Sequence, residues 1–228
     1  MAWVNGHRRL GKTGGFRHDE KDVAGPYLGD SLGMGRANLM LYTVTGDRTY
    51  LKDAVASLKF IEKTFRGKHG TFYTAKQTSK LIPPMTERSE NISLARFANL
   101  VHHLTGEKSF REVAEGVMKA YSSADYLTES PVSALLLLDG DLSQDPTHIT
   151  VVGAKSDPVS RTLFLGAMNF PDTYLRLEWW DKKEGPLPRN DVTYPSLPKA
   201  AAFVCTGGRC SLPIAAVDKI RTTVDSFQ

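Results

Sequence analysis

The feature that most constrains the fold is a match of the chain to itself. Residues 36–47 align without a gap with residues 96–107, and an offset of 60 residues separates Gly46 from Gly106. The first copy ends in Thr-Gly-Asp and the second in Thr-Gly-Glu. Because repeats of this order of length are usually stacked supersecondary units, the chain is expected to contain at least two copies of one helical unit.

Each copy has the apolar spacing of a helix, a turn and a second helix. In the second copy the first helix carries apolar residues three and four positions apart, at Leu94, Phe97, Val101 and Leu104. The second helix repeats this spacing at Phe110, Ala114, Met118 and Tyr121. The same stripes in the first copy are Met34, Ala37, Leu41 and Val44, then Tyr50, Ala54, Leu58 and Ile61. The pattern predicts antiparallel α/α-hairpins.

The turn residues favour this interpretation. Gly46 and Gly106 stand where a helix end commonly needs a left-handed residue. Asp47 is a good N-cap for the following helix, and Glu107 is a poorer cap that keeps the charge.

The hairpin array is predicted over residues 29–142. A further helix is expected to begin at Ser130, with Pro131 in its first turn, and to end near Asp139. Residues 1–28 are rich in glycine and charge and are expected to form an extended, unpacked lead-in. The segment 67–88 is expected to be a loop with a short strand at residues 71–73.

From about residue 143 the pattern changes to a small α/β module over residues 143–228. Strands are predicted at residues 149–152, 173–180 and 200–205, and His148 is interpreted simply as the start of the first strand. Asp157 and Pro158 are typical of a helix start, and a last helix is expected at residues 216–226. Strand, helix and strand in this order favour parallel pairing. The predicted fold class is therefore α+β, a hairpin array followed by a three-stranded α/β module.

Composition excludes several classes of protein. No apolar run approaches the roughly 20 residues that a membrane span requires. The net charge of +4 is spread along the chain, which does not favour a nucleic-acid partner. The first ten residues lack the apolar stretch of a secretory signal, so we expect a cytoplasmic protein. The two cysteines are too few for a secreted disulfide framework.

The repeat offset also pairs two acids. Asp30 and Glu90 are 60 residues apart, and each stands near the start of the first helix of its copy. Neighbouring hairpins would place both carboxylates at one mouth, and paired carboxylates suit glycoside chemistry. The alternative is that each acid only stabilises the positive end of its helix. Other residues that could line this mouth and bind a ligand are Arg36, Tyr73, Asn91, Arg96, His18 and Asp19. Arg36 and Arg96 are equally expected as surface or hairpin-linking residues.

Cys205 and Cys210 enclose Thr-Gly-Gly-Arg, in which two glycines permit a tight loop. The thiols are therefore expected within reach of each other, and Arg209 could favour a thiolate. Two structural thiols, a reversible disulfide and a metal site all remain open, although a metal would need further ligands that the neighbourhood does not supply. Lys155, before the helix at Asp157, is a candidate for holding an anion. No cofactor or metal is expected.

The order of these motifs is similar to that of a known family. The chain resembles, from about Gly25 onward, the C-terminal part of the YyaL-type thioredoxin-domain proteins, which are related to the spermatogenesis-associated thioredoxin-like protein. The resemblance rests on the Thr-Gly-Asp turn, Ala134-Leu-Leu-Leu-Leu-Asp139, Ile149-Thr-Val-Val-Gly153, and Ala202-Phe-Val-Cys205 with Cys210 and Pro213. It implies a helical toroid of the six-hairpin glycosidase type and a small α/β piece. The family's thioredoxin domain and roughly half of the toroid have no counterpart in this sequence, so a partial toroid is expected.

Three functions follow as hypotheses. The first is an accessory fragment without demonstrable catalysis, which binds itself or a thioredoxin and toroid portion through exposed hairpin faces. The second is a carbohydrate-binding or carbohydrate-active toroid that uses Asp30 and Glu90 on a small carbohydrate. The third is a redox protein that uses Cys205 and Cys210 with a thioredoxin-like partner.

Overall fold

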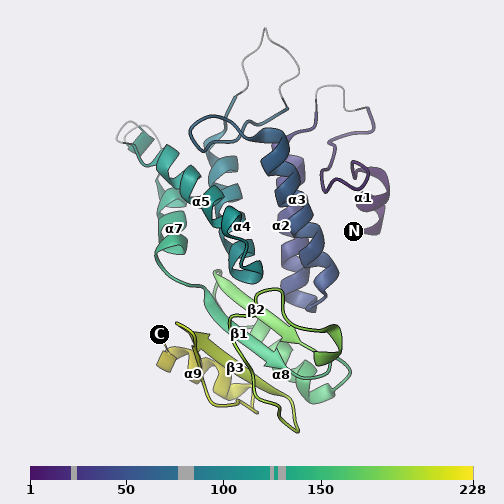
Figure 1. Ribbon diagram of the computed structural model, residues 1–228, viewed down its shortest axis with the longest axis vertical. Coiled ribbons are helices and arrows are strands. Elements are labelled where there is room, and N and C mark those ends of the chain that lie inside the picture. The colour runs from purple at the N-terminus through teal and green to yellow at the C-terminus, as the bar shows by residue number, and fades with distance from the viewer. Residues whose placement is uncertain (22–24, 77–84, 124–125, 128–131, 228) are drawn as a thin grey trace. The chain divides into compact units, whose positions relative to one another are not determined.

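A computed structural model describes residues 1–21, 25–76, 85–123, 126–127 and 132–227 (Figure 1). These residues contain helices and one mixed four-stranded sheet, which confirms the α+β fold class. The chain forms two compact units, Met1–His102 with Glu107–Ser143, and His103–Gly106 with Gln144–Gln228. None of the described helices is both long and apolar enough to cross a membrane.

The first unit is built from the predicted helical hairpins. Its main helices are α2 (Leu28–Thr45), α3 (Arg48–Phe65), α4 (Arg88–Thr105), α5 (Lys108–Tyr121) and α7 (Ser133–Ser143). Gly46 ends α2 with φ 66°, and Gly106 follows α4 with φ 76°, so both are left-handed as expected. Asp47 caps α3 by accepting from Thr49 N–H, whereas Glu107 makes no side-chain cap bond to α5.

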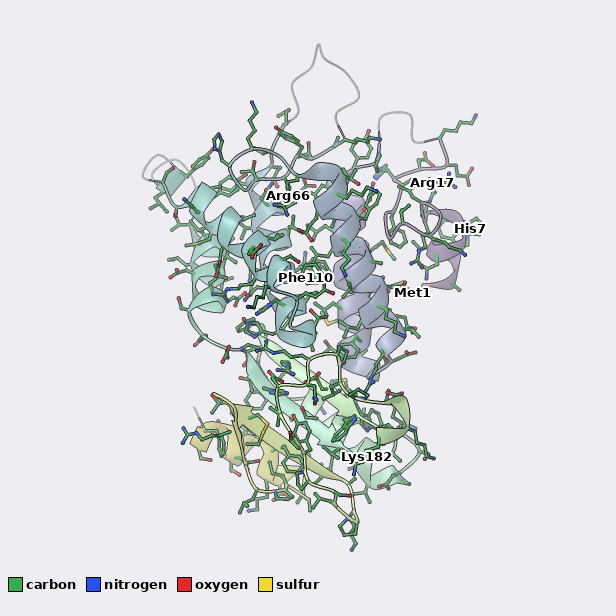
Figure 2. All side chains as sticks on the ribbon, viewed as in Figure 1. Met1, His7, Arg17, Arg66, Phe110 and Lys182 are labelled. Carbon is green, nitrogen blue, oxygen red and sulfur yellow. A yellow bond between two sulfur atoms is a disulfide. The ribbon has the colours of Figure 1, made fainter. Side chains whose placement is uncertain are left out.

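The predicted apolar stripe is buried on α4 of the second copy, but its equivalent on α2 of the first copy is largely not buried. Leu94, Phe97, Val101 and Leu104 of α4 are at most 4% exposed, and Phe110 of α5 lies wholly in the interior (Figure 2). The expected stripe of α2 is wrong, since Ala37 is exposed and Val44 is 39% exposed. The buried face of α2 instead carries Leu28, Leu32, Leu39 and Tyr42. The difference arises because α4 packs between neighbours, and its Phe97 ring lies against Gly35 on this other face of α2.

The lead-in is packed, which corrects the expectation of an unpacked segment. It contains α1 (Ala2–His7), and Phe16 is only 2% exposed. The N–H of Phe16 donates to Ser31 Oγ, and Ser57 Oγ donates to the carbonyl of Gly14. A Cβ at Gly14 would lie 2.2 Å from the carbonyl oxygen of Ala56, so glycine is what lets this backbone reach α3.

Two local expectations in the array change. Residues 71–73 form only isolated bridges, Phe72 with Arg66 and Tyr73 with Thr86, so the predicted short strand is wrong. The helix predicted at residues 130–139 is present as α7, four residues longer at its end. Its expected start at Ser130 and Pro131 lies outside the described residues.

The second unit contains a sheet of order β2-β1-β3-β4. The strands are β1 (Thr147–Val152), β2 (Leu175–Trp180), β3 (Ala201–Thr206) and β4 (Arg209–Cys210). β1 and β2 are parallel and are joined through α8 (Pro158–Met168), which Asp157 caps as predicted. β3 runs antiparallel to β1, and the short β4 is a fourth strand that the sequence did not predict.

The two faces of this sheet differ in chemistry. One face buries Ile149, Val151, Leu177 and Trp179 against α8 and α9 (Asp218–Phe227) in an apolar core. The opposite face is covered by the connection between β2 and β3, which begins with a 3₁₀ turn at Lys182–Glu184 and supplies Leu187 and Tyr194. That second face also carries the charged side chains described below.

Candidate functional site

The acids that the repeat paired lie near each other at the first turns of α2 and α4. The pKa of Glu90 is raised by burial of the carboxyl and then by the negative charges of Glu87 and Asp30. One oxygen of each acid, Asp30 Oδ2 and Glu90 Oε2, is buried without a hydrogen-bond partner among the described residues. Asp30 and Glu90 therefore share one electrostatic environment, which favours the protonated form of Glu90.

His18 of the lead-in belongs to the same group. Its Nδ1 lies 3.1 Å from Asp30 Oδ1, and the ring of Tyr27 stands edge-on to its imidazole. Asp19 instead pairs with Arg8, outside this group. Sequence reasoning missed Tyr27 and also Glu87, whose carboxylate accepts from the backbone N–H groups of Ser89 and Glu90 at the start of α4.

Of the four other residues expected at this mouth, Asn91, Arg96 and Tyr73 make structural contacts elsewhere. Asn91 is fully buried and bonds both to the N–H and to the carbonyl of Phe72. Arg96 forms a 2.6 Å ion pair with Asp141 of α7. Arg36 is exposed on α2, and Tyr73 is held through its backbone N–H by the carbonyl of Phe65. These contacts hold helices and loops together.

A second cluster surrounds the two cysteines, which form a disulfide across β3 and β4. Cys205 and Cys210 are paired residues of this antiparallel hairpin, and the turn consists of Gly207 and Gly208, both at positive φ. Cys205 is 4% exposed, whereas Cys210 is half-buried. Closing so short a loop stabilises the fold by only about 2 kcal/mol in the chain-entropy description.

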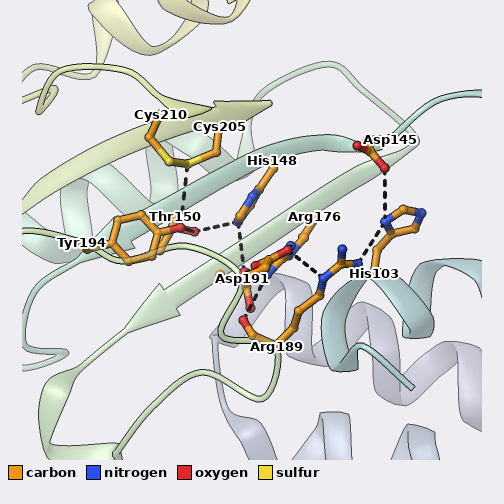
Figure 3. A network of polar contacts seen from close by, with 11 residues as sticks. His103, Asp145, His148, Thr150, Arg176, Arg189, Asp191, Tyr194, Cys205 and Cys210 are labelled. Carbon is orange, nitrogen blue, oxygen red and sulfur yellow. Dashed lines mark hydrogen bonds and ion pairs between the residues drawn. A yellow bond between two sulfur atoms is a disulfide. The ribbon is translucent and has the colours of Figure 1, made fainter. Parts of the chain in front are cut away.

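Beside the disulfide, polar side chains occupy adjacent positions across the sheet (Figure 3). The strand register places Arg176 of β2, His148 of β1 and Cys205 of β3 side by side, and Glu178 beside Thr150 in the next row. Since side chains alternate along a strand, these residues point to one face.

This face carries one continuous hydrogen-bonded network. Its members are Cys205, Tyr194, Thr150, His148, Glu178, Arg176 and Asp191. His148 Nε2 lies 2.9 Å from Thr150 Oγ1 and 3.0 Å from Glu178 Oε2. Arg176 donates to Glu178 through Nε and to Asp191 through both terminal nitrogens. Glu178 is completely buried, so Arg176 supplies the positive partner that a buried carboxylate requires, and His148 contacts the same carboxylate oxygen.

Burial and pairing set the protonation of this cluster. Burial opposes the charge of Arg176, but Asp191 and Glu178 raise its pKa above the ordinary value. Burial likewise opposes the charge of Asp191, and the hydrogen bonds and charge of Arg176 lower its pKa on balance. Burial raises the pKa of Tyr194 far above its ordinary value, so its phenol stays protonated at neutral pH.

A pocket of about 300 Å³ opens beside this network within the second compact unit. Its walls include His148, Arg176, Asp191 and Cys205, and the turn at Gly207 forms part of its rim. A volume near 300 Å³ is at the lower end of small-ligand sites. The network therefore reaches the pocket at His148.

The anion site expected at Lys155 is occupied by the chain's own acids. Lys155 Nζ lies 2.6 Å from Glu184 Oε1, and its backbone N–H donates to Asp181. Within the described ranges, no group of three or more His, Cys, Asp or Glu side chains is arranged to hold a metal ion.

No protein-family model matches the chain, and no curated protein matches it either. The resemblance to the YyaL-type proteins therefore stays a prediction, and so does the partial toroid.

Proposed function

We propose that the hairpin array works as an assembly module in which α2 of one chain binds α7 of a second copy. The observation that carries this proposal is the unequal burial of one helical face in the two repeats. Phe97, Val101 and Leu104 of α4 are buried, whereas Val44, the repeat equivalent of Leu104, is 39% exposed. A face that needs a neighbour in one repeat is expected to need one in the other.

The free face of α2 is apolar enough to bind another helix. Met40 on this face is 65% exposed, and Leu41 is half-buried. At the other end of the array, α7 exposes Leu136 and Leu137 by 63% and 53%. Contiguous apolar surface of this kind commonly marks a protein interface. The two ends differ, so their contact is heterologous and joins copies head to tail.

Single charges placed at the two ends test this arrangement. We expect the parent chain to associate in sedimentation velocity as its concentration rises, and Met40→Glu and Leu137→Glu each to abolish that association. An equimolar mixture of the two variants retains one intact α2 face and one intact α7 face, so it is expected to form a discrete dimer. Leu212→Glu, at a residue 85% exposed in the other unit, is the control and should associate like the parent.

A parent chain that remains monomeric at all concentrations would overturn the proposal. Association of Leu137→Glu with itself, together with a monomeric Met40→Glu, would replace the head-to-tail contact by a symmetric α2 contact. Circular dichroism of each variant identifies any loss of folding.

We also propose that the chain corresponds to the C-terminal part of a YyaL-type protein and acts in the cytoplasm. The support is the order of elements. Two helical hairpins are followed by the helix α7, then by a β-α-β unit and the cysteine hairpin. On this proposal, the assembly face is the surface that such a protein would use for its other hairpins.

A carbohydrate-active acid pair is the second candidate function, and the raised pKa of Glu90 favours it. Acids whose environments separate their pKa values can act as proton donor and as base or nucleophile. Here Glu90 would be the proton donor, and Asp30, which contacts His18, would be the base or nucleophile. Asp30→Asn and Glu90→Gln are expected to weaken binding of a sugar panel by the full chain, as measured by calorimetry. Absence of any binding by the parent would remove this function.

A further inference from the structure

The disulfide in the sheet unit is connected to a buried chain of proton-carrying groups. Tyr194 OH lies 3.8 Å from Cys205 Sγ and donates to Thr150 Oγ1 at 2.7 Å. Thr150 Oγ1 is in turn 2.9 Å from His148 Nε2. All four residues are less than 8% exposed, so bulk water does not replace the contacts between them.

The chain of contacts begins at one sulfur and ends at the pocket. Cys210 is the more accessible of the two cysteines, whereas Cys205 is buried and next to Tyr194. His148 lines the pocket, through which its ring can exchange protons with solvent. The structure thus distinguishes the more accessible sulfur of Cys210 from the buried sulfur of Cys205, which is connected to His148 through Tyr194 and Thr150.

We propose that Cys205 and Cys210 form a thiol–disulfide exchange centre for a dithiol reductant. Cys210 is the attacked sulfur and Cys205 is the leaving sulfur, which receives a proton from His148 through Tyr194 and Thr150. This role is independent of the assembly module proposed above, since every residue that it uses belongs to the sheet unit.

The exchange balances in two steps. A thiolate of the dithiol attacks Cys210 Sγ, a new S–S bond forms, the Cys205–Cys210 bond breaks, and Cys205 leaves with the electron pair. The Tyr194 O–H turns from Thr150 Oγ1 to the Cys205 thiolate and gives it its proton, the Thr150 O–H replaces the proton of Tyr194, and the imidazolium of His148 replaces that of Thr150. The second thiol of the reductant then displaces Cys210, which takes the released proton. The chain ends as a dithiol and the reductant as a disulfide.

The surroundings of the two proton carriers fit these roles. Burial raises the pKa of Tyr194, so the phenol is a hydroxyl that can donate. The titratable groups around His148 are Glu178 and Arg176 on β2, Asp191 and Arg189 on the connection that follows, and His103 and Asp145, which line the same pocket. Glu178 Oε2 contacts His148 Nε2 directly, while Asp191 pairs with both arginines. Cys205 on β3 lies beside His148 in the sheet.

The test is the rate at which dithiothreitol reduces the full chain, followed by maleimide labelling of the freed thiols. Tyr194→Phe removes only the hydroxyl, and we expect reduction to slow by about tenfold or more, as for loss of one hydrogen bond to a charged group. Tyr174→Phe, on the same unit, is the matched control and should reduce at the parent rate. Thermal unfolding of each oxidised variant separates an effect on the exchange from an effect on the fold.

A second readout is the pH profile. The ratio of the parent rate to the His148→Gln rate should be larger at acid pH, where a histidine is charged, than at alkaline pH, where it is neutral. The ratio cancels the change in thiolate content of the reductant. A ratio that does not vary with pH would overturn the relay.

The attacked sulfur is tested with single-cysteine variants. Cys205→Ser leaves Cys210, which should label with maleimide faster than the Cys205 that remains in Cys210→Ser. Equal reactivity would overturn the assignment of the two sulfurs. Folded parent protein that dithiothreitol cannot reduce would overturn the exchange centre itself, whatever the relay variants do.

Discussion

Two glutamates, one in each compact unit, illustrate different ways of removing a carboxylate from water. Glu178 is completely buried on β2, and its Oε2 accepts from Arg176 and contacts His148. Glu90, at the start of α4, is only partly buried, but its neighbours are the acids Glu87 and Asp30. The sheet unit therefore places an arginine and a histidine beside a buried carboxyl group, whereas the helical unit places acids together.

The difference shows that surroundings, more than the depth of burial, set the protonation of an acid. A carboxylate in a poorly solvated site either has a charged partner or takes up a proton. Glu90 follows the second course, because burial and two negative neighbours raise its pKa. In the sheet unit, Arg176 instead lowers the pKa of Asp191.

The largest expected effect comes from removing the shared cation. Arg176→Met leaves the completely buried Glu178 without its principal partner, and we expect it to lower the free energy of unfolding by about 3–5 kcal/mol. Urea unfolding followed by tryptophan fluorescence measures this, because Trp179 and Trp180 lie on the same strand. Arg36→Met, at an exposed position on α2, is the control and should change stability by less than about 0.5 kcal/mol. Equal losses would contradict the contrast between the units.

A smaller effect of opposite sign is expected at Glu90. Its folded pKa is raised above the unfolded value, so its contribution to stability is full below the unfolded pKa and is lost as pH rises through the folded pKa. Glu90→Gln should therefore stabilise the fold at pH 7 by about 0.5 kcal/mol, a figure reduced for solvent screening, and should match the parent near pH 4.

Asp30→Asn provides the control for this second prediction. It removes one of the charges that raise the pKa of Glu90, so the pKa should fall toward its ordinary value, as followed by NMR titration of the carboxyl carbon. A pKa that does not move would show that Asp30 has no part in the environment of Glu90. A Glu90→Gln variant less stable than the parent at pH 7 would contradict the sign.

Local features of the chain were predictable because they depend on residues close in sequence. The helix ends at Gly46 and Gly106 follow from the ability of glycine to adopt positive φ, and Asp47 and Asp157 from their short acceptor side chains. The 60-residue offset also singled out Asp30 and Glu90, and the negative charge of Asp30 does raise the pKa of Glu90. The face of α2 was misassigned, because its burial depends on which neighbour packs against it.

The polar face of the sheet had a sequence signal that was overlooked. His148 and Thr150 alternate with apolar residues, and so do Arg176 and Glu178. Two polar residues at a spacing of two within otherwise apolar strands indicate a polar row on one face. The signal does not say which strands are neighbours, so it could not have connected this row to the cysteines.

The sequence alone determined the hairpins, their caps, the β-α-β unit and the closeness of Cys205 and Cys210, since periodicity and turn chemistry act over a few residues. Only the tertiary structure decided that β3 lies antiparallel beside β1, which places His148 next to Cys205 and Tyr194 against its sulfur. It also decided which face of α2 is free. Both outcomes depend on pairing between segments far apart in the chain, which local propensity leaves open.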